Sequence, residues 1–193
     1  MGSKSITLIR SDELRPQVES VLSALFEKVA ALLPGADYHH IGATAIPGSV
    51  TKGDLDIQIL VSPSDFESAK ETLAKHFEIR QPKNWTTSFA SFGDDVTYGL
   101  QVGVQLASRD SESDFLVYLR DYLIDHPEEL MQYNRIKQAN ARFGADQYWR
   151  EKDKFFAKIL APWTKARGES PNQSSEPTPS SVTPPAGQES RPR

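Results

Sequence analysis

The run of residues 40–57 constrains this chain more than any other segment. It leaves a short strand candidate, crosses a loop with three glycines, and enters an alternating segment that carries Asp54 and Asp56. Side chains at i and i+2 of a strand point to the same side, so the spacing predicts both carboxylates on one face. Mg²⁺ is typically held by a few carboxylates together with substrate phosphates. The run therefore predicts a site for Mg²⁺ beside a phosphate-binding loop.

The loop itself offers groups that suit a phosphate. Gly42 and Gly48 would let backbone amides approach a phosphate closely, and the hydroxyl of Thr44 would add a donor. Lys52 would add positive charge. The loop is not of the Walker type, because that motif needs Gly-Lys-Ser/Thr opening a helix. Here the order is Thr-Lys-Gly, and a strand follows.

The spacing of apolar residues predicts strands mainly in the first two thirds of the chain and helices in the last third. Predicted strands cover residues 38–41, 54–59 and two segments within 85–107, which are joined near residue 94. Predicted helices cover residues 14–33, 64–76 and three segments after residue 113, with breaks near residues 126 and 144. The second helix would open with a Ser-x-x-Glu capping box at 64–67. This order predicts an α/β or α+β fold, with a mixed sheet and a helical C-terminal layer.

The length of 193 residues indicates one domain, which we place at residues 5–163. Residues 164–193 are predicted to form a disordered Pro/Ser-rich tail. From residue 168 onwards the tail has six prolines and six serines but a single large aliphatic residue. Such a segment cannot bury enough apolar surface to offset its ordering entropy.

A family resemblance adds to this interpretation. Residues 40–48 read His-Ile-Gly-Ala-Thr-Ala-Ile-Pro-Gly, and residues 51–56 read Thr-Lys-Gly-Asp-Leu-Asp. The run resembles the signature of the nucleotidyltransferase superfamily and, more narrowly, that of the GrpB family, whose hallmark is His-Ile-Gly-Ser-Thr-Ala-Val-Pro-Gly. The likeness continues through residues 102–106, 119–123, 133–137 and 148–152. It implies a nucleotidyltransferase-like fold, a nucleoside triphosphate as ligand, and Mg²⁺ held by Asp54 and Asp56 as catalytic residues.

Two positions depart from the pattern that the resemblance implies. Ala43 replaces the usual Ser and lacks the hydroxyl that helps to hold a phosphate in related transferases. Related transferases also place a third carboxylate on a later strand, but residues 101–107 contain no acid, and Gln105 is the nearest polar candidate. Glutamine offers a neutral oxygen to a metal but cannot act as a general base. Asp94 or Asp95, in the preceding turn, is the alternative source of the missing acid.

Arg120, Lys137 and Lys152 lie on the predicted late helices, in segments that match the family. The resemblance makes them candidates to hold a triphosphate or an anionic acceptor. The alternative, that they are ordinary solvated helix charges, stays open. We expect five aromatic residues to be core rather than a base-stacking platform, because no basic residues interleave with them: Trp85, Phe89, Phe92, Phe155 and Phe156.

Composition excludes several classes of function. A formal net charge of -4 gives no reason to expect nonspecific binding to nucleic acid or anionic lipid. The absence of cysteine excludes disulfides, thiolate metal sites and a cysteine nucleophile, and it fits a cytoplasmic location. We find neither an apolar run long enough to cross a bilayer nor a signal peptide, so no membrane association is expected.

Two functional hypotheses follow, and a third is weaker. The first is a Mg²⁺-dependent nucleotidyltransferase that uses a nucleoside triphosphate, ATP foremost, and an unknown acceptor. The second is a non-catalytic, regulatory nucleotide-binding module that kept the fold but lost the third acid. The third is a partner-binding protein in which the loop is structural and the tail makes the contact.

Overall fold

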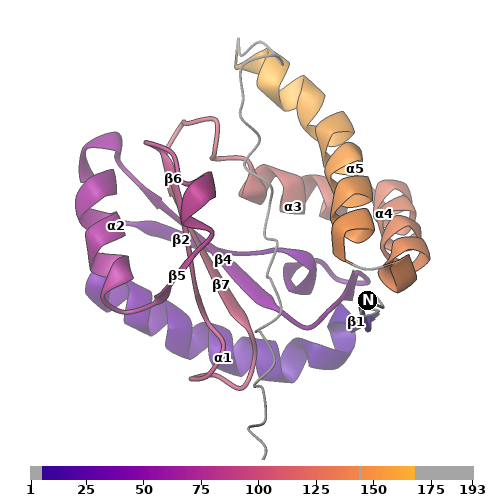
Figure 1. Cartoon of the computed structure of the whole chain (residues 1–193), viewed down its shortest axis with the longest axis horizontal. Helices are drawn as coiled ribbons and strands as arrows, with labels where there is room; N and C mark the ends of the chain where they lie inside the picture. The colour runs from indigo at the N-terminus through magenta and orange to yellow at the C-terminus, as the bar shows by residue number, and fades with distance from the viewer. Residues whose placement is uncertain (1–5, 144, 168–193) are drawn as a thin grey trace, which may run out of the picture.

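The computed structural model describes residues 6–143 and 145–167 (Figure 1). The strands are β1 (Ile9–Arg10), β2 (Asp37–Ile41), β3 (Val50–Thr51), β4 (Leu55–Val61), β5 (Glu78–Arg80), β6 (Phe89–Asp94) and β7 (Val102–Ser108). The α-helices are α1 (Ser11–Leu32), α2 (Phe66–Ala74), α3 (Leu116–Asp125), α4 (Pro127–Asn140) and α5 (Ala145–Ala166). A 3-10 turn, Ala43–Ala45, lies in the glycine-containing loop.

The main sheet is mixed and has five strands in the order β2-β4-β7-β6-β5. Its centre is a parallel pair, β4 and β7, and the other pairs are antiparallel. The register places Asp56 beside Gly103 and Gln58 beside Gln105. Strands β1 and β3 form a separate two-stranded sheet. The predicted fold class, a mixed sheet followed by C-terminal helices, is confirmed.

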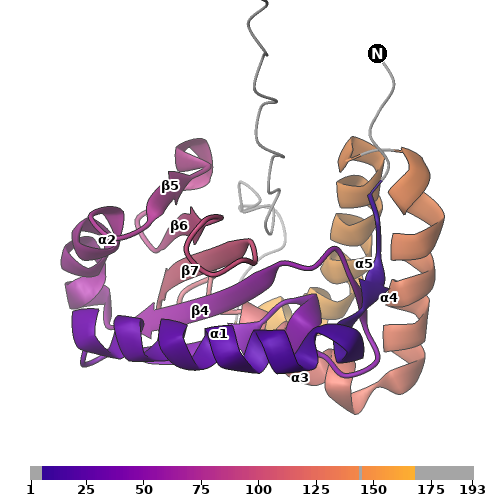
Figure 2. The same cartoon turned by 90° about the horizontal axis from the view of Figure 1, so that it is seen from below.

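One face of the main sheet packs against α1 and α2 to form a core that we call the sheet core. The apolar residues of α1 recur at helical spacing, so they share one face of that helix. Figure 2 shows α1 running along the sheet. The alternate, inward-pointing residues of the central strands complete this core: Leu55, Ile57, Ile59, Val102, Val104 and Leu106.

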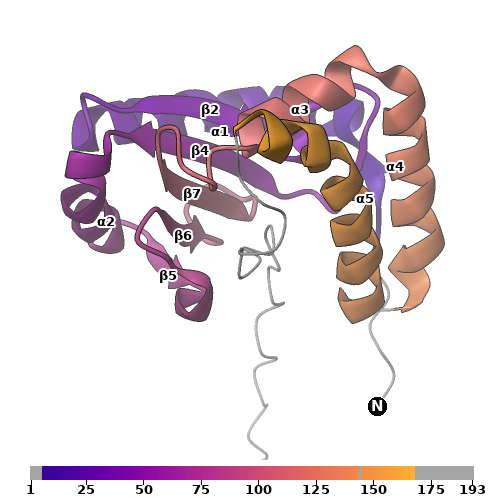
Figure 3. The same ribbon diagram turned by 90° about the horizontal axis from the view of Figure 1, so that it is seen from above.

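The last third of the chain builds a second apolar cluster, which we call the helical core. Figure 3 shows α3, α4 and α5 gathered at one end of the molecule, with α2 and β5 at the other. The buried members of the helical core are Ile46, Leu119, Leu123, Tyr133, Phe155, Phe156 and Ile159. Ile46 is the one member that comes from the glycine-containing loop, so this loop is tied to the helical half of the molecule.

Three local features differ from the sequence prediction. The polar side of β4 is buried as well as the apolar side, because the helical half covers it. The capping box does not form: α2 begins at Phe66 without a side-chain cap, and the Ser62 hydroxyl instead bonds the Asp65 carboxylate at 2.6 Å. Strands β1, β3 and β5 were missed, because two or three residues give no alternating signal.

Helix α5 continues to Ala166, three residues beyond the boundary predicted at residue 163. The rest of the predicted tail, residues 168–193, lies outside the described residues. Within the part of the chain that the structure describes, no helix combines the length and apolar character needed to cross a membrane.

Candidate functional site

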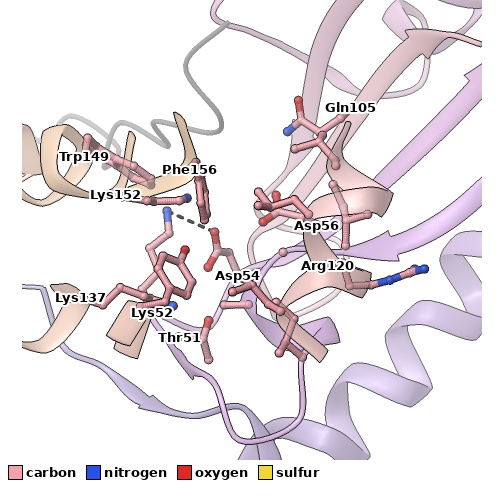
Figure 4. A pocket seen from close by; sticks show the side chains of 18 of the residues that line it. Thr51, Lys52, Asp54, Asp56, Gln105, Arg120, Lys137, Trp149, Lys152 and Phe156 are labelled. Carbon is pink, nitrogen blue, oxygen red and sulfur yellow. Dashed lines mark ion pairs between the residues drawn. The ribbon is translucent and has the colours of Figure 1, made fainter. Parts of the chain in front are cut away.

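A pocket opens where the starts of β4 and β7 meet the helical half of the molecule (Figure 4). From the sheet side and the loops it is lined by Ile41, Gly42, Ala43, Ile46, Thr51, Lys52, Asp54, Asp56, Phe89 and Gln105. From the helical side it is lined by Phe115, Leu116, Leu119, Arg120, Leu123, Tyr133, Lys137, Tyr148, Trp149, Lys152 and Phe156.

Asp54 and Asp56 form what we call the acidic wall. Both line the pocket and are largely buried, with 9% and 8% of their surface exposed. Gly103 lies beside Asp56 in the sheet, and a Cβ atom there would collide with the Asp56 Oδ1 atom. A Cβ atom on Gly42 would lie 2.8 Å from Oδ2 of the same carboxylate. Any residue other than glycine at either position would therefore displace the Asp56 carboxylate.

The Asp56 carboxylate is short of favourable partners. Its Oδ1 atom is buried and makes no hydrogen bond with the described residues. Burial, and then the negative charge of Asp54, raises the pKa of Asp56 to about 7, against the opposing effect of Lys52 and Lys152. A buried, unpartnered carboxylate oxygen is suited to a bound cation, which would supply the missing positive charge.

The donor set fits Mg²⁺ with few protein ligands. Within the described residues there is no group of three or more His, Cys, Asp or Glu side chains that could hold a metal ion. A cation here would therefore bind Asp54 and Asp56, with the side-chain amide of the buried Gln105 as a neutral candidate that also lines the pocket. Mg²⁺ usually keeps several waters and takes phosphate oxygens as its remaining ligands, so two carboxylates suffice.

Three lysines, Lys52, Lys137 and Lys152, form what we call the basic wall. The ammonium group of Lys52 lies 3.2 Å from Oδ2 of Asp54. Lys137 is only 2% exposed, and its ammonium group donates to the carbonyl of Val50.

The pKa values of two of these lysines, Lys137 and Lys152, are lowered in the pocket. Burial, followed by the charge of Lys152, lowers the pKa of Lys137 to about 7. Burial, followed by the charge of Lys52, lowers the pKa of Lys152 to about 8. Three ammonium groups in one partly dry pocket favour an anionic ligand, because its charge would offset both effects.

The indole of Trp149 lies among these lysines. The ammonium groups of Lys52 and Lys152 lie 4.9 and 4.6 Å from the centre of its ring. Phe89 and Phe156 are buried, as predicted, but they also line the pocket. Trp149 was not among the aromatic residues considered from the sequence, and the fold brings Lys52 to it from a distant loop.

Thr44 and Gly48 are not among the residues that line the pocket. The Thr44 hydroxyl donates to the backbone carbonyl of Asp54 at 3.2 Å and lies 3.1 Å from Nε2 of His40. The Gly48 amide donates to the Asp12 carboxylate at 3.3 Å, and its carbonyl accepts from Asn134. The structure thus places both residues where they hold the loop, whereas Gly42 lies in the pocket itself.

Arg120 lines the pocket, but its guanidinium group is held elsewhere. It donates to the carbonyl of His40 at 2.8 Å and pairs with Asp121 at 2.7 Å. Figure 4 shows it directed away from Asp54. Burial, and then the Arg120 charge, lowers the pKa of His40 to about 4, so the imidazole is neutral near pH 7.

The sequence match to known families covers most of the described residues. The family described as "GrpB protein" matches residues 9–162. This chain belongs to the GrpB family. A UPF0157 protein of Vibrio cholerae is 32% identical over 157 residues, which cover 78% of this chain and 80% of the relative. The resemblance stated from residues 40–56 is confirmed.

Solved structures with a similar fold include the conserved protein GrpB from Enterococcus faecalis. It matches with a TM-score of 0.65 and 18% identity over 84% of this chain and 100% of that chain. A more distant likeness is to the Cid1 poly(U) polymerase, with a TM-score of 0.46 and 13% identity over 69% of this chain and 44% of that chain. The first comparison shows that the GrpB fold is shared, and neither shows an activity.

The alternative sources of a third acid lie away from the pocket of this GrpB protein. Asp94 accepts hydrogen bonds from the amides of Val96 and Thr97, and Asp95 pairs with Arg80 at 2.8 Å. Neither aspartate lines the pocket. Of the three candidates for the third position, Gln105, Asp94 and Asp95, only Gln105 lies beside the acidic wall.

Sequence reasoning missed Tyr133, Tyr148 and Trp149 as pocket residues, and it missed Gly103 as the neighbour of Asp56. The sequence could have indicated the role of Gly103, because an isolated glycine within a strand pattern indicates that another group lies close to the backbone there. Tyr148 is buried, and burial, followed by the negative charge of Asp54, raises the pKa of its hydroxyl well above its usual value. The aromatic residues gave no such signal, because helical core residues have the same spacing.

Proposed function

We propose that this GrpB protein binds Mg²⁺ with a nucleoside triphosphate and transfers a nucleotidyl group to an acceptor. The observation that carries the proposal is the division of charge in one pocket: two buried carboxylates on one side and three lysines on the other. A metal-bound triphosphate presents both signs of charge. It would therefore complement both walls at once.

Each group has a role in this proposal. Asp54 and Asp56, with the Gln105 amide oxygen, hold Mg²⁺, which when bound neutralises charge on the phosphates. Lys137 and Lys152 bind the phosphate oxygens, while Lys52 bridges from Asp54 to the ligand. Gly42 and Ala43 present the loop backbone to the pocket.

The reaction is a displacement at the α-phosphorus. The acceptor's oxygen or nitrogen forms a bond to that phosphorus, and the bond to the bridging oxygen of the β-phosphate breaks. Pyrophosphate leaves with the electron pair, and the acceptor's proton passes to solvent water. The side chains contribute positioning and charge stabilisation, which supply most of the catalysis in phosphoryl transfer.

A second candidate function is nucleotide binding without transfer. The observation that favours it is Gln105, which lines the pocket beside the acidic wall, whereas the family resemblance implies a third carboxylate on this strand. Neither Asp94 nor Asp95 supplies that acid. A protein of this kind would bind Mg-ATP and respond to it, without releasing pyrophosphate.

Calorimetric titration of ATP, GTP, CTP and UTP, each with and without MgCl₂, tests the proposal. We expect binding of at least one triphosphate to strengthen tenfold or more with Mg²⁺, and pyrophosphate to be released when an acceptor is present. Metal-dependent binding without pyrophosphate release, from any acceptor offered, would select the second candidate. If Mg²⁺ strengthens the binding of none of the four, both candidates are wrong.

A further inference from the structure

The pocket has a third side, which is apolar. It is made of Phe89 on β6 together with Phe115, Leu116, Leu119 and Leu123 at the start of α3 and along it, and we call it the apolar wall. Positions 116, 119 and 123 share one face of the helix, which explains why they line the pocket together. Arg120 is the one charged α3 residue that lines the pocket, and its guanidinium group is held by His40 and Asp121.

The basic wall and α3, the helix that carries most of the apolar wall, lie on opposite sides of Asp54. Lys137 and Lys152 are close to the connection between α4 and α5, at residues 141–144. A single residue separates the end of α3 from the start of α4, so α3 meets the other end of α4. In Figure 4, Asp54 lies between Lys137 and Lys152 on one side and Arg120 of α3 on the other.

This arrangement fixes the direction of attack, if the proposed transfer is correct. In phosphoryl transfer the attacking and leaving oxygens lie roughly in line through the phosphorus. The leaving pyrophosphate carries the negative charge, so the basic wall is its natural site. An acceptor must then approach from the opposite side, along the apolar wall.

We infer that the acceptor is a small alcohol or amine whose reactive group is carried by an aromatic or aliphatic body, which the apolar wall binds. Burying such a body is favourable by roughly 25 cal/mol per Å². A sugar phosphate or the end of a nucleic acid would bring charge to a wall whose one cation is already paired. Burying an unpaired charge costs far more than burying an apolar group. This inference rests on the proposed function for its assignment of the phosphate side.

A binding experiment with 1-naphthol as the probe tests the wall without turnover. Leu116 is half-buried and lines the pocket, but it belongs to neither the sheet core nor the helical core. We expect Leu116→Gln to weaken 1-naphthol binding fivefold or more, measured by ligand-observed NMR, and to leave Mg-ATP affinity within twofold. Val117→Gln is the matched control, because Val117 is half-buried on the same helix and does not line the pocket.

The opposite pattern would overturn the inference. If Leu116→Gln weakens Mg-ATP and leaves 1-naphthol unchanged, the apolar wall holds the nucleobase and not the acceptor. Phe89→Ala, on the sheet side of the same wall, gives a second reading if Leu116→Gln fails to fold. A protein that binds 1-naphthol through Leu116 but never binds Mg-ATP would contradict the proposed transfer while supporting an apolar ligand at this wall.

Pyrophosphate release from Mg-ATP tests the class of acceptor directly. We expect 2-phenylethanol and phenethylamine to stimulate release at least tenfold more than ribose or glycerol 3-phosphate at equal concentration. Equal or faster release with ribose or glycerol 3-phosphate would contradict the inference and would leave the proposed transfer intact.

Discussion

The acidic wall and the basic wall of the pocket hold buried charge in different ways. The Asp56 carboxylate is fixed by strand pairing and lies between two glycines, so its position depends on backbone geometry. Lys137 and Lys152 stand on helices that have their own apolar core, so their positions depend on packing. Burial shifts the pKa of Asp56 up to about 7 and that of Lys137 down to about 7, which in each case favours the neutral form.

This difference shows what the two walls lack. The contact between Lys52 and Asp54 is the only ion pair between the walls found among the described residues. Asp56 and the two helical lysines remain short of opposite charge. A ligand that brings a cation to one wall and phosphate to the other would relieve both at once. The following variants separate the contribution of the acidic wall to ligand binding from that of the basic wall.

The largest effect is expected at the acidic wall. Asp54→Asn keeps the shape of the side chain but removes a charge that would hold the metal, so Mg²⁺-dependent nucleotide affinity should fall tenfold or more, or at least ~1.4 kcal/mol. Calorimetry in MgCl₂ and in EDTA measures this. Asp125→Asn, at the exposed end of α3, is the control. Equal Mg-ATP affinity in Asp54→Asn and the parent would refute a shared metal site.

Gly103→Ala tests the same wall without changing any charge. The new methyl group would collide with the Asp56 carboxylate, which must rotate away because it is the more flexible partner. We expect Mg²⁺-dependent affinity to fall about tenfold, roughly 1.4 kcal/mol, while the protein stays folded. Gly35→Ala, where the methyl group meets nothing within 4 Å, should have no effect on affinity. Unchanged affinity in Gly103→Ala would show that the position of Asp56 is unimportant for the metal.

At the basic wall, Lys152→Gln should weaken nucleotide binding about fivefold, roughly 1 kcal/mol, with or without Mg²⁺. The loss is independent of the metal because the side chain contacts phosphate and not the cation. Lys154→Gln, two residues further along α5, is the control because Lys154 is exposed and pairs with Glu151. A loss confined to MgCl₂ would contradict the division of roles between the walls.

Per pH unit, the smallest effect is expected in the dependence of stability on pH. The pKa of Lys137 is lower in the folded protein, so this group makes stability rise with pH from about 7 to its usual 10.5. The pKa of Asp56 is higher in the folded protein, so Asp56 makes stability fall as pH rises from its usual 3.8 to about 7. Lys137→Met should remove the rise, and Asp56→Asn should remove the fall. Each change should be roughly 0.5–1 kcal/mol per pH unit.

Urea unfolding of the two variants and the parent at pH 5, 7 and 9 measures these slopes. Parallel pH profiles for Lys137→Met and the parent between pH 7 and 9 would show that Lys137 stays charged without cost. In that case the contrast between the two walls does not hold.

The order of elements was predictable from the sequence because long apolar periods indicate it. The period of α1 and the break at Pro34-Gly35 placed the first helix, and His126-Pro127 separated α3 from α4. The strand that carries Asp56 was predicted from its alternation. That its polar side would also be buried was not, because this depends on helices more than fifty residues later in the chain.

The candidate site was predictable in part for a similar reason. The spacing of Asp54 and Asp56 is a local property, and both lie in the pocket. The resemblance alone suggested Lys137 and Lys152. The positions of Gly48 and Arg120 depend on tertiary partners, since Asp12 and Asn134 hold the first and the His40 carbonyl holds the second. No local pattern specifies such contacts.

The anchoring of the glycine-containing loop has a consequence for hydrogen exchange. Ile46 is buried in the helical core, and Asn134 on α4 bonds both the carbonyl of Gly48 and the amide of Val50. Amides exchange when the cooperative unit that protects them opens. Although the loop follows β2 in sequence, the Val50 amide should exchange together with the amides of α4 and not with those of the main sheet. Opening of the helical unit would therefore dismantle the glycine-containing loop while the sheet stays protected.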